Sequence, residues 1–357
     1  MKTLEVKSSL HDYKITIGSG TRFHTQKLIS KSYTSILIIT DDVIAPLYLE
    51  DLINTFKNQK VYTYILPNGE AEKSISNYYK IQTKAIEYGL DRDSLLIALG
   101  GGVVGDITGF VAATYMRGID FIQVPTTILS HDSSVGGKVA INHELGKNLI
   151  GAFYPPKAVI YDIDTLKTLN DAEKRSGYAE IIKEAFISDS VFLNELLTIN
   201  INNLTSEQLS NHLYKGIKIK AEIVEADEKE SNIRKYLNLG HTLSHAIESE
   251  LGYGEITHGE AVAIGIIFAL RISEIKYNIN LPITDYINWM KMNNYPFDLS
   301  GLKTERLIQK MKTDKKSKNQ VIQMVLLKEI GKPATKNLSD DFLTEQLNKF
   351  IKELKSL

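Results

Sequence analysis

Short apolar runs alternate with longer stretches of helical periodicity along the first 165 residues of the chain. Five runs are rich in β-branched residues and mostly continuous, which is typical of strands buried on both faces of a parallel sheet. They cover residues 35–40, 60–66, 94–99, 121–124 and 158–161. Helix-like stretches such as residues 76–88 lie between them. This alternation predicts an α/β layer with a parallel, Rossmann-like sheet and helices on both faces.

The pattern changes near residue 164. Long helical patterns cover residues 171–187, 207–225, 239–250 and 259–277, and few strand signals follow until residues 321–327. A length of 357 residues is compatible with about two domains. We therefore predict an α/β domain over residues 1–163 and a mostly helical domain over residues 164–357.

Composition and charge exclude several classes of protein. The 42 Lys and Arg residues nearly balance 43 Asp and Glu residues, so no basic surface for nucleic acid or membrane is indicated. The absence of cysteine excludes disulfides, iron–sulfur clusters and a thiol nucleophile, and leaves His, Asp and Glu as metal ligands. The first residues lack the apolar run of a secretory signal, and no apolar run is long enough to span a bilayer. A cytoplasmic protein is expected.

A glycine-rich segment follows the third predicted strand. Gly100, Gly102 and Gly105 satisfy the pattern G-x-G-x-x-G between a strand and a helix, where backbone N–H groups can approach a pyrophosphate. A tight turn with close helix–sheet packing is the alternative. The motif lies on a middle strand, and Asp41, an acidic residue suited to a ribose, ends an earlier strand. A nucleotide crossing several strand ends is still what an open α/β sheet would bind.

Histidines cluster in the predicted helical domain. His241 and His245 are four residues apart on one helix face, and His258 opens the next helix. Glu180 lies on an earlier helix, on the same face as Lys183. Two or three histidines with one carboxylate suit a divalent ion of the zinc type. A surface or core histidine pair is the alternative, but three of the eight histidines within 18 residues favour a metal.

Cationic and amide side chains accompany these motifs. Lys138 follows a Gly-rich segment, Arg117 precedes a predicted buried strand, and Lys147, Asn148 and Arg234 add further donors. Together they could hold an anionic, phosphorylated substrate. For any one of them alone, a surface salt bridge is the alternative.

These motifs, in this order, resemble the 3-dehydroquinate synthase family of the shikimate pathway over nearly the whole chain. The resemblance is carried by residues 67–74 (PNGEAEKS), 98–106 (ALGGGVVGD), 116–118 (MRG), 123–127 (QVPTT), 132–138 (DSSVGGK), 146–151 (GKNLIG), 178–183 (YAEIIK), 238–242 (NLGHT) and 258–260 (HGE). One departure lies between Thr127 and Ser133, where many members have one more residue than the ILSHD of this chain. His131, within that segment, has no assigned role.

The resemblance implies an NAD-binding α/β domain, a helical domain, an active site in the cleft and a homodimer. The family converts 3-deoxy-D-arabino-heptulosonate 7-phosphate to 3-dehydroquinate and phosphate, with bound NAD and a divalent metal, usually zinc or cobalt. The reaction proceeds by oxidation of the C5 hydroxyl, β-elimination of phosphate, re-reduction, ring opening and intramolecular aldol closure. It is a lyase reaction that is redox-neutral overall.

The resemblance also assigns residues to roles. The metal ligands match Glu180, His241 and His258. The NAD contacts match Asp41, Glu70, Lys73, Gly102, Val103, Val104, Gly105, Asp106, Thr126, Thr127, Lys138, Lys147, Thr165, Leu166, Lys167 and Thr168. The catalytic and substrate positions match Asp132, Lys138, Asn148, Lys183, Lys220, Arg234, Asn238, His245, Lys315 and Lys316. Arg117 is expected to reach a phosphate, either in its own subunit or across the dimer interface.

Three other functions are alternatives to the synthase activity that the resemblance implies. A metal-dependent polyol dehydrogenase of the glycerol dehydrogenase type shares the fold plan, but its small neutral substrates would not need Arg117, Lys138, Lys147 and Lys315 or Lys316. Another sugar-phosphate cyclase, such as 2-deoxy-scyllo-inosose synthase, would share most of the motifs. A non-catalytic dinucleotide sensor would have no use for a metal with an open coordination position.

Overall fold

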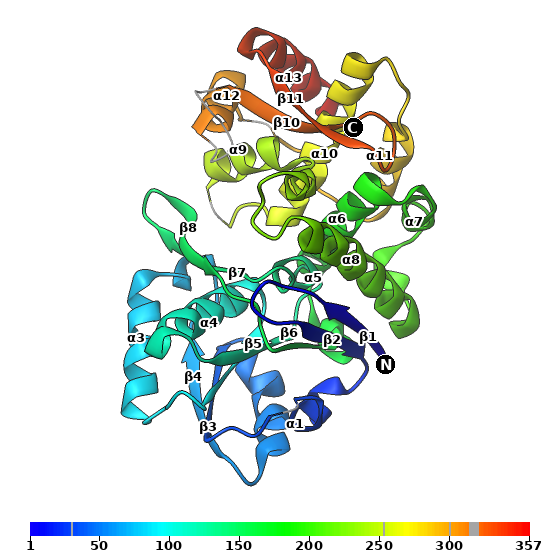
Figure 1. The fold of residues 1–357 in the computed structure, drawn as a ribbon. Coiled ribbons are helices and arrows are strands. Elements are labelled where there is room, and N and C mark those ends of the chain that lie inside the picture. The colour runs from blue at the N-terminus through cyan, green and yellow to red at the C-terminus, as the bar shows by residue number, and fades with distance from the viewer. Residues whose placement is uncertain (30, 253, 300, 314–320) are drawn as a thin grey trace. The chain divides into compact units, whose positions relative to one another are not determined.

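The computed structural model describes residues 1–29, 31–252, 254–299, 301–313 and 321–357 (Figure 1). Contacts within the chain group it into two compact units. The first consists of Met1–Leu169 and Thr205–Lys229, and the second of Asn170–Leu204 and Glu230–Leu357.

The first unit is built on a seven-stranded sheet with the strand order β1-β2-β9-β6-β5-β3-β4. Its strands are β1 (Lys2–Val6), β2 (Tyr13–Gly18), β3 (Ser35–Asp41), β4 (Lys60–Leu66), β5 (Leu95–Gly100), β6 (Asp120–Pro125) and β9 (Ala158–Asp162). All neighbouring strands are parallel except β1 and β2. The five strands expected from the apolar runs are confirmed.

Helices cover both faces of this sheet, as predicted. They are α1 (Thr25–Leu28), α2 (Glu50–Ile53), α3 (Ile75–Glu87), α4 (Gly102–Thr114), α5 (Ser130–Ser133) and α8 (Ser206–Ala226). Leu37 of β3 packs in one core with Ile81 of α3 and Ile107 of α4. Ile38, the next residue, points to the other face and shares a core with Leu52 of α2. Because β3 is buried on both faces, its sequence is a continuous apolar run.

A two-stranded antiparallel hairpin lies between β6 and β9 along the chain. It consists of β7 (Lys138–His143) and β8 (Gly146–Phe153). The apolar pattern did not predict it, because no residue of β8 is fully buried and two glycines interrupt the strand signal.

The second unit is mostly helical, as predicted. Its helices are α6 (Asp171–Ser188), α7 (Ser190–Leu196), α9 (His241–Leu251), α10 (His258–Tyr277), α11 (Ile283–Met292), α12 (Thr304–Thr313) and α13 (Asp340–Leu354), with a hairpin of β10 (Ile322–Leu327) and β11 (Pro333–Leu338). Helix α10 is buried almost all round from Gly259 to Leu270, which explains why it contains the longest apolar run of the chain, Ala261–Leu270. No helix among the described residues is long and apolar enough to cross a membrane.

Candidate functional site

Four segments singled out in the sequence lie at one edge of the parallel sheet. Strand β3 ends at Asp41, β5 at Gly100, β6 just before Thr126, and β9 just before a 3-10 helix, Ile163–Thr168. These strands run parallel to one another, so their carboxyl ends share an edge. Open α/β sheets bind ligands at that edge.

Asp41 is held at the end of β3 by the backbone that follows it. Its Oδ1 atom accepts hydrogen bonds from the backbone N–H groups of Val43 (3.0 Å) and Ile44 (2.9 Å). Burial raises the pKa of the Asp41 carboxyl, and the two backbone donors act in the opposite direction. The carboxylate is therefore fixed where dinucleotide folds place an acid for a ribose hydroxyl.

The glycine-rich turn lets α4 begin directly against the sheet. A Cβ atom on Gly100 would lie 2.7 Å from a methyl carbon of Val104, so close packing alone requires a glycine here. Gly101 gives the helix no side-chain cap, and the hydroxyl of the adjacent Thr126 is buried without a hydrogen-bond partner among the described residues. The close helix–sheet packing is therefore present, and uncapped N–H groups beside an orphaned hydroxyl are groups that a pyrophosphate could bind.

Asn142 of β7 ties several predicted NAD and substrate residues together. Its amide nitrogen donates to Oε1 of Glu70 at 2.8 Å, and its backbone N–H donates to the Lys73 carbonyl at 2.7 Å. Its amide oxygen accepts the backbone N–H of Asn148 at 3.0 Å. Lys73 in turn forms an ion pair with Asp106 of α4. Burial raises the pKa of Asp106, and the Lys73 ammonium beside it lowers that pKa.

The predicted cationic residues of the first unit lie in different parts of it. Lys138 is exposed at the base of the hairpin, opposite Phe153, whereas Lys147 lies next to its turn. Arg117 is exposed on a turn and has a positive φ of 67°. Lys220 of α8 pairs with Asp132 of α5 at 2.9 Å. Within the first unit, the structure therefore brings Lys220 to Asp132 and keeps Lys138 and Lys147 at opposite ends of one hairpin.

His131, which has no role assigned from the sequence, is fully buried in the turn that contains Asp132. Its Nδ1 atom lies 2.7 Å from the Ile128 carbonyl oxygen. This contact fixes the turn locally.

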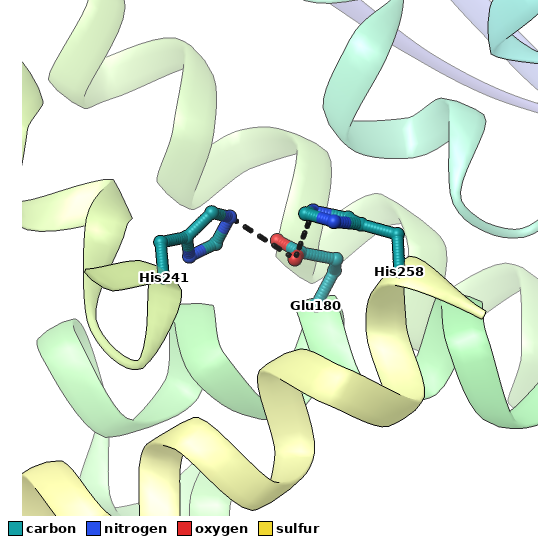
Figure 2. A group of neighbouring side chains, drawn as sticks. All are labelled: Glu180, His241 and His258. Atoms are coloured by element: carbon teal, nitrogen blue, oxygen red, sulfur yellow. Dashed lines mark ion pairs between the residues drawn. The ribbon is translucent and has the colours of Figure 1, made fainter. Parts of the chain in front are cut away.

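The second unit brings the three predicted metal ligands together (Figure 2). Glu180 lies on α6, and His241 and His258 are the first residues of α9 and α10. Oε1 of Glu180 lies 3.5 Å from Nε2 of His241 and 3.7 Å from Nε2 of His258. The second oxygen of Glu180 pairs with the buried ammonium of Lys183.

Neighbouring groups orient both imidazoles. Nδ1 of His258 lies 2.9 Å from a carboxylate oxygen of Glu248, and Nδ1 of His241 lies 3.2 Å from the Leu239 carbonyl oxygen. Both oxygens can only accept, so each ring carries its proton on Nδ1 and directs the Nε2 lone pair toward Glu180. This is the outer-shell arrangement of metal-binding histidines.

The spacing of the three donor atoms fits a metal of the zinc type. Ligands about 2.1 Å from a tetrahedral ion lie roughly 3.4 Å apart, close to the separations of the Glu180 oxygen from the two nitrogens. Oε1 of Glu180 is buried and has no hydrogen-bond partner among the described residues. A buried carboxylate oxygen facing two nitrogen lone pairs is repulsive unless a cation or a proton lies between them.

His245 lies beside this group. Its ring centroid is 5.5 Å from that of His241 and 5.9 Å from that of His258. His245, Glu248 and His258 form a second set of neighbouring donors. Because Glu248 and Nδ1 of His258 are at hydrogen-bond distance, Glu248 orients His258, and the Glu180 set is the candidate metal site.

A close helix crossing places Glu180 and His258 next to each other. A Cβ atom on Gly259 would lie 1.9 Å from the Ser176 carbonyl oxygen of α6, so only glycine allows this approach. Glu260 closes a capping box with Thr257 and accepts a hydrogen bond from Arg175 of α6 at 2.7 Å. Residues 258–260 therefore combine three roles: His258 is a candidate metal ligand, Gly259 contacts α6 closely, and Glu260 anchors α10 to α6 through Arg175.

The remaining predicted residues of the second unit lie on α6 and on the 3-10 helix Ile233–Asn238. Lys183 and Arg234 are almost completely buried, and the Asn238 amide donates to Glu230 at 3.3 Å. The predicted basic residues Lys315 and Lys316 lie outside the described residues.

Sequence reasoning missed several positioning residues. Glu248 could have been found, because it lies three residues after His245 and seven after His241 on one helix face. Asn142 and Arg175 act through contacts with residues far away in the sequence, so no local pattern indicated them.

The fold is one that solved structures of a sugar-phosphate cyclase and of dehydrogenases share. The chain matches 2-deoxy-scyllo-inosose synthase, solved with carbaglucose-6-phosphate, NAD+ and Co2+, with a TM-score of 0.89, 25% identity and coverage of 98% of this chain and 100% of the other. A probable glycerol dehydrogenase from Sinorhizobium meliloti matches less well, with a TM-score of 0.63 and 16% identity over 96% of this chain and 97% of the other. At that identity the likeness concerns the fold alone.

Sequence comparison narrows the class to one family. The family model for the N-terminal part of 3-dehydroquinate synthase matches residues 63–176, and the model for its C-terminal part matches residues 177–317. The 3-dehydroquinate synthase of Oceanobacillus iheyensis is 52% identical over 359 aligned positions that cover 100% of both chains. The chain belongs to the 3-dehydroquinate synthase family and is an enzyme of that family.

Proposed function

We propose that this chain converts 3-deoxy-D-arabino-heptulosonate 7-phosphate to 3-dehydroquinate and phosphate, using NAD and a zinc-type divalent metal. The observation that carries the proposal is the 52% identity to a 3-dehydroquinate synthase over the full length of both chains. The Glu180, His241 and His258 geometry supports the metal, and the carboxyl edge of the sheet supports the dinucleotide.

The metal and NAD supply chemistry that the side chains lack. When bound, the metal polarises the hydroxyls of the substrate, and NAD accepts a hydride and later returns it. Glu180, His241 and His258 would hold the metal. Asp41, Glu70, Lys73, Gly102–Asp106, Thr126, Thr127, Lys138, Lys147 and Thr165–Thr168 would hold the dinucleotide.

The protein side chains bind and orient the substrate. Lys138, Asn148 and Arg117 are proposed to position the phosphate and carboxylate groups by charge-assisted hydrogen bonds. Lys220 and Asp132, already paired, would meet a substrate hydroxyl and its proton. In the second unit, Lys183, Arg234, Asn238 and His245 are proposed to complete the substrate contacts. The phosphate needs little help from a protein base, since its own oxygens can accept the proton released on elimination.

We also propose a cytoplasmic homodimer with domains over residues 1–163 and 164–357. Arg117, exposed on its turn, would then be able to serve a neighbouring subunit. Sedimentation of the purified protein tests the dimer, because the chain mass is 40.1 kDa and a dimer has twice that mass. A single species at the chain mass at assay concentrations would contradict it.

The activity is tested by following two products at once. Purified protein is incubated with the heptulosonate phosphate, zinc and a trace of NAD, and phosphate and NADH are measured together. Phosphate is expected to accumulate in step with 3-dehydroquinate while NADH stays near zero. His258→Ala, with an unchanged thermal midpoint, is the control and should release no phosphate.

Two results would refute the synthase assignment. Stoichiometric NADH would indicate a dehydrogenase instead. Absence of phosphate release despite full metal and NAD occupancy would exclude the cyclase reaction itself.

A further inference from the structure

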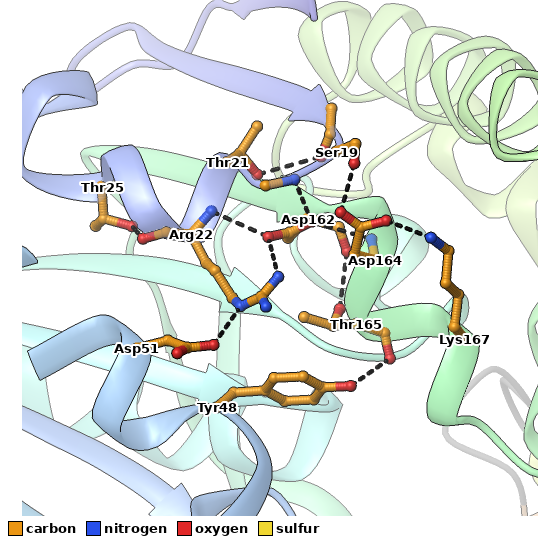
Figure 3. A network of polar contacts seen from close by, with 12 residues as sticks. Ser19, Thr21, Arg22, Thr25, Tyr48, Asp51, Asp162, Asp164, Thr165 and Lys167 are labelled. Atoms are coloured by element: carbon orange, nitrogen blue, oxygen red, sulfur yellow. Dashed lines mark hydrogen bonds and ion pairs between the residues drawn. The ribbon is translucent and has the colours of Figure 1, made fainter. Parts of the chain in front are cut away.

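A buried polar network fixes the start of the 3-10 helix Ile163–Thr168 (Figure 3). The Asp162 carboxylate, fully buried at the end of β9, accepts the backbone N–H groups of Gly20 (2.9 Å), Arg22 (3.1 Å) and Asp164 (3.0 Å). The guanidinium of Arg22 adds an ion pair with it at 2.8 Å. The turn that follows β2 and the residues that follow β9 are thus joined through one carboxylate.

Tyr48 holds the other end of the same 3-10 helix. Its hydroxyl donates to the Thr165 carbonyl oxygen at 3.2 Å and lies 2.7 Å from Oγ1 of Thr168. The Thr168 hydroxyl also donates to the Thr165 carbonyl at 3.0 Å. A single phenol group therefore contacts both threonines of the segment.

Arg22 connects the two ends. Its guanidinium lies 5.3 Å from the centre of the Tyr48 ring and donates to Asp51 at 2.9 Å. Tyr48 itself belongs to a short π-helix, Ala45–Leu49, that follows Asp41 within one turn. Such π-turns are rare and frequently lie at functional sites.

The position of Tyr48 in the chain relates these contacts to the proposed dinucleotide site. Tyr48 follows the Asp41 turn at the end of β3 and reaches the Thr165–Thr168 segment after β9. Strands β5 and β6 lie between β3 and β9 in the sheet, so the phenol links two segments that are not neighbours. Both segments are proposed NAD contacts.

We propose that Tyr48, supported by Arg22, is a positioning residue that fixes the Thr165–Thr168 segment for dinucleotide binding. The inference rests on the proposed function, because Thr165–Thr168 is assigned to NAD there. The contacts of Tyr48 described above all lie within the first unit, so its loss is expected to act on dinucleotide binding. Without the Tyr48 hydroxyl, the Thr165–Thr168 segment would be less ordered before NAD binds. Ordering it on binding would then weaken the affinity for NAD.

The test removes only the hydroxyl, with Tyr48→Phe. The control is Tyr33→Phe. Tyr33 is a buried tyrosine just before the opposite end of β3, and its hydroxyl contacts Asp120 at 3.2 Å. NAD affinity is measured by titration calorimetry on NAD-free protein, with zinc content and thermal midpoint measured on the same samples. Hydrogen–deuterium exchange of the peptide covering residues 163–169 is followed without NAD.

Tyr48→Phe is expected to weaken NAD binding about three- to tenfold, the effect of one lost hydrogen bond. It should also speed exchange in that peptide, while zinc content and kcat at saturating NAD stay near those of the parent. Tyr33→Phe should bind NAD like the parent. Equal NAD affinity in Tyr48→Phe and parent would overturn the inference, as would parallel losses of NAD affinity, zinc and thermal midpoint. A parent protein that fails to bind NAD would instead refute the proposed function.

Discussion

At the scale of single residues, the metal site depends on a carboxylate that does not belong to the proposed ligand set. Glu248 binds the Nδ1 proton of His258 at 2.9 Å and so directs Nε2 toward Glu180. Glu248→Ala should weaken zinc binding by about 10- to 100-fold, the usual effect of losing such a partner. Glu248→Gln, which retains an acceptor oxygen, should lose less.

Competition with a chromophoric chelator measures this effect. The control is Glu250→Ala on the same helix, because Glu250 pairs with Arg306 at 2.9 Å. Zinc affinity that falls equally in the Glu248 and Glu250 variants would show that α9 is merely weakened as a whole.

Glu173, in the first turn of α6, should make stability depend on pH. Burial raises the pKa of its carboxyl, and the nearby Glu260 raises it further. A folded-state pKa above the unfolded value means that the folded protein binds more protons, so this group lowers stability as pH rises through that range. Glu173→Gln removes the group that titrates.

The thermal midpoint of metal-free protein tests this effect. Glu173→Gln should be more stable than the parent at pH 7, and the difference should shrink as the pH falls toward 4. A difference that stays constant over this range would show that Glu173 does not titrate as described.

At the scale of elements, the crossing of α6 and α10 sets the distance between two ligands. Gly259→Ala would place a methyl group 1.9 Å from the Ser176 carbonyl oxygen, so the helices must separate. Overpacking of this kind costs about 1–3 kcal/mol in unfolding free energy. His258 would move away from Glu180, and zinc affinity should fall more than tenfold.

Ile275→Ala on α10 is the control, since this side chain is 52% exposed and its loss should shift stability by less than about 0.5 kcal/mol. Denaturant unfolding gives the stability, and chelator competition gives the affinity. A Gly259→Ala protein with parental zinc affinity would show that the crossing does not position the ligands.

The elements that the sequence predicted best are those whose burial leaves a clear pattern. Strands β3, β5 and β9 are apolar because neighbours cover both of their faces, whereas the edge strand β4 is only partly buried. Helices α6 and α10 begin and end within one residue of the bounds expected from the sequence. The β7–β8 hairpin was missed because its glycines and exposed residues give no strand signal. Helix α8 was expected at residues 207–225, yet nothing local indicated that it packs with the first unit, where Lys7 donates to Glu225 at 2.8 Å.

The residues of the candidate site also fall into those that the sequence predicted and those that it did not. Glu180, His241 and His258 were expected from ligand type and from the family resemblance, and the structure brings their donor atoms together. Residues that act through others, such as Asn142, Tyr48 and Glu248, were not found. Their partners are set by tertiary contacts, which a linear pattern does not contain.

At the scale of the whole molecule, the proposed reaction requires that one substrate molecule gives up a hydride to NAD and receives the same hydride back. The most direct test uses heptulosonate phosphate deuterated at C5, unlabelled NAD in trace amount, and mass spectrometry of the 3-dehydroquinate formed. One phosphate per product and full retention of the deuterium at that carbon are expected, with no deuterated NADH released. Product that has lost the deuterium, or deuterated NADH in step with turnover, would contradict the proposed reaction.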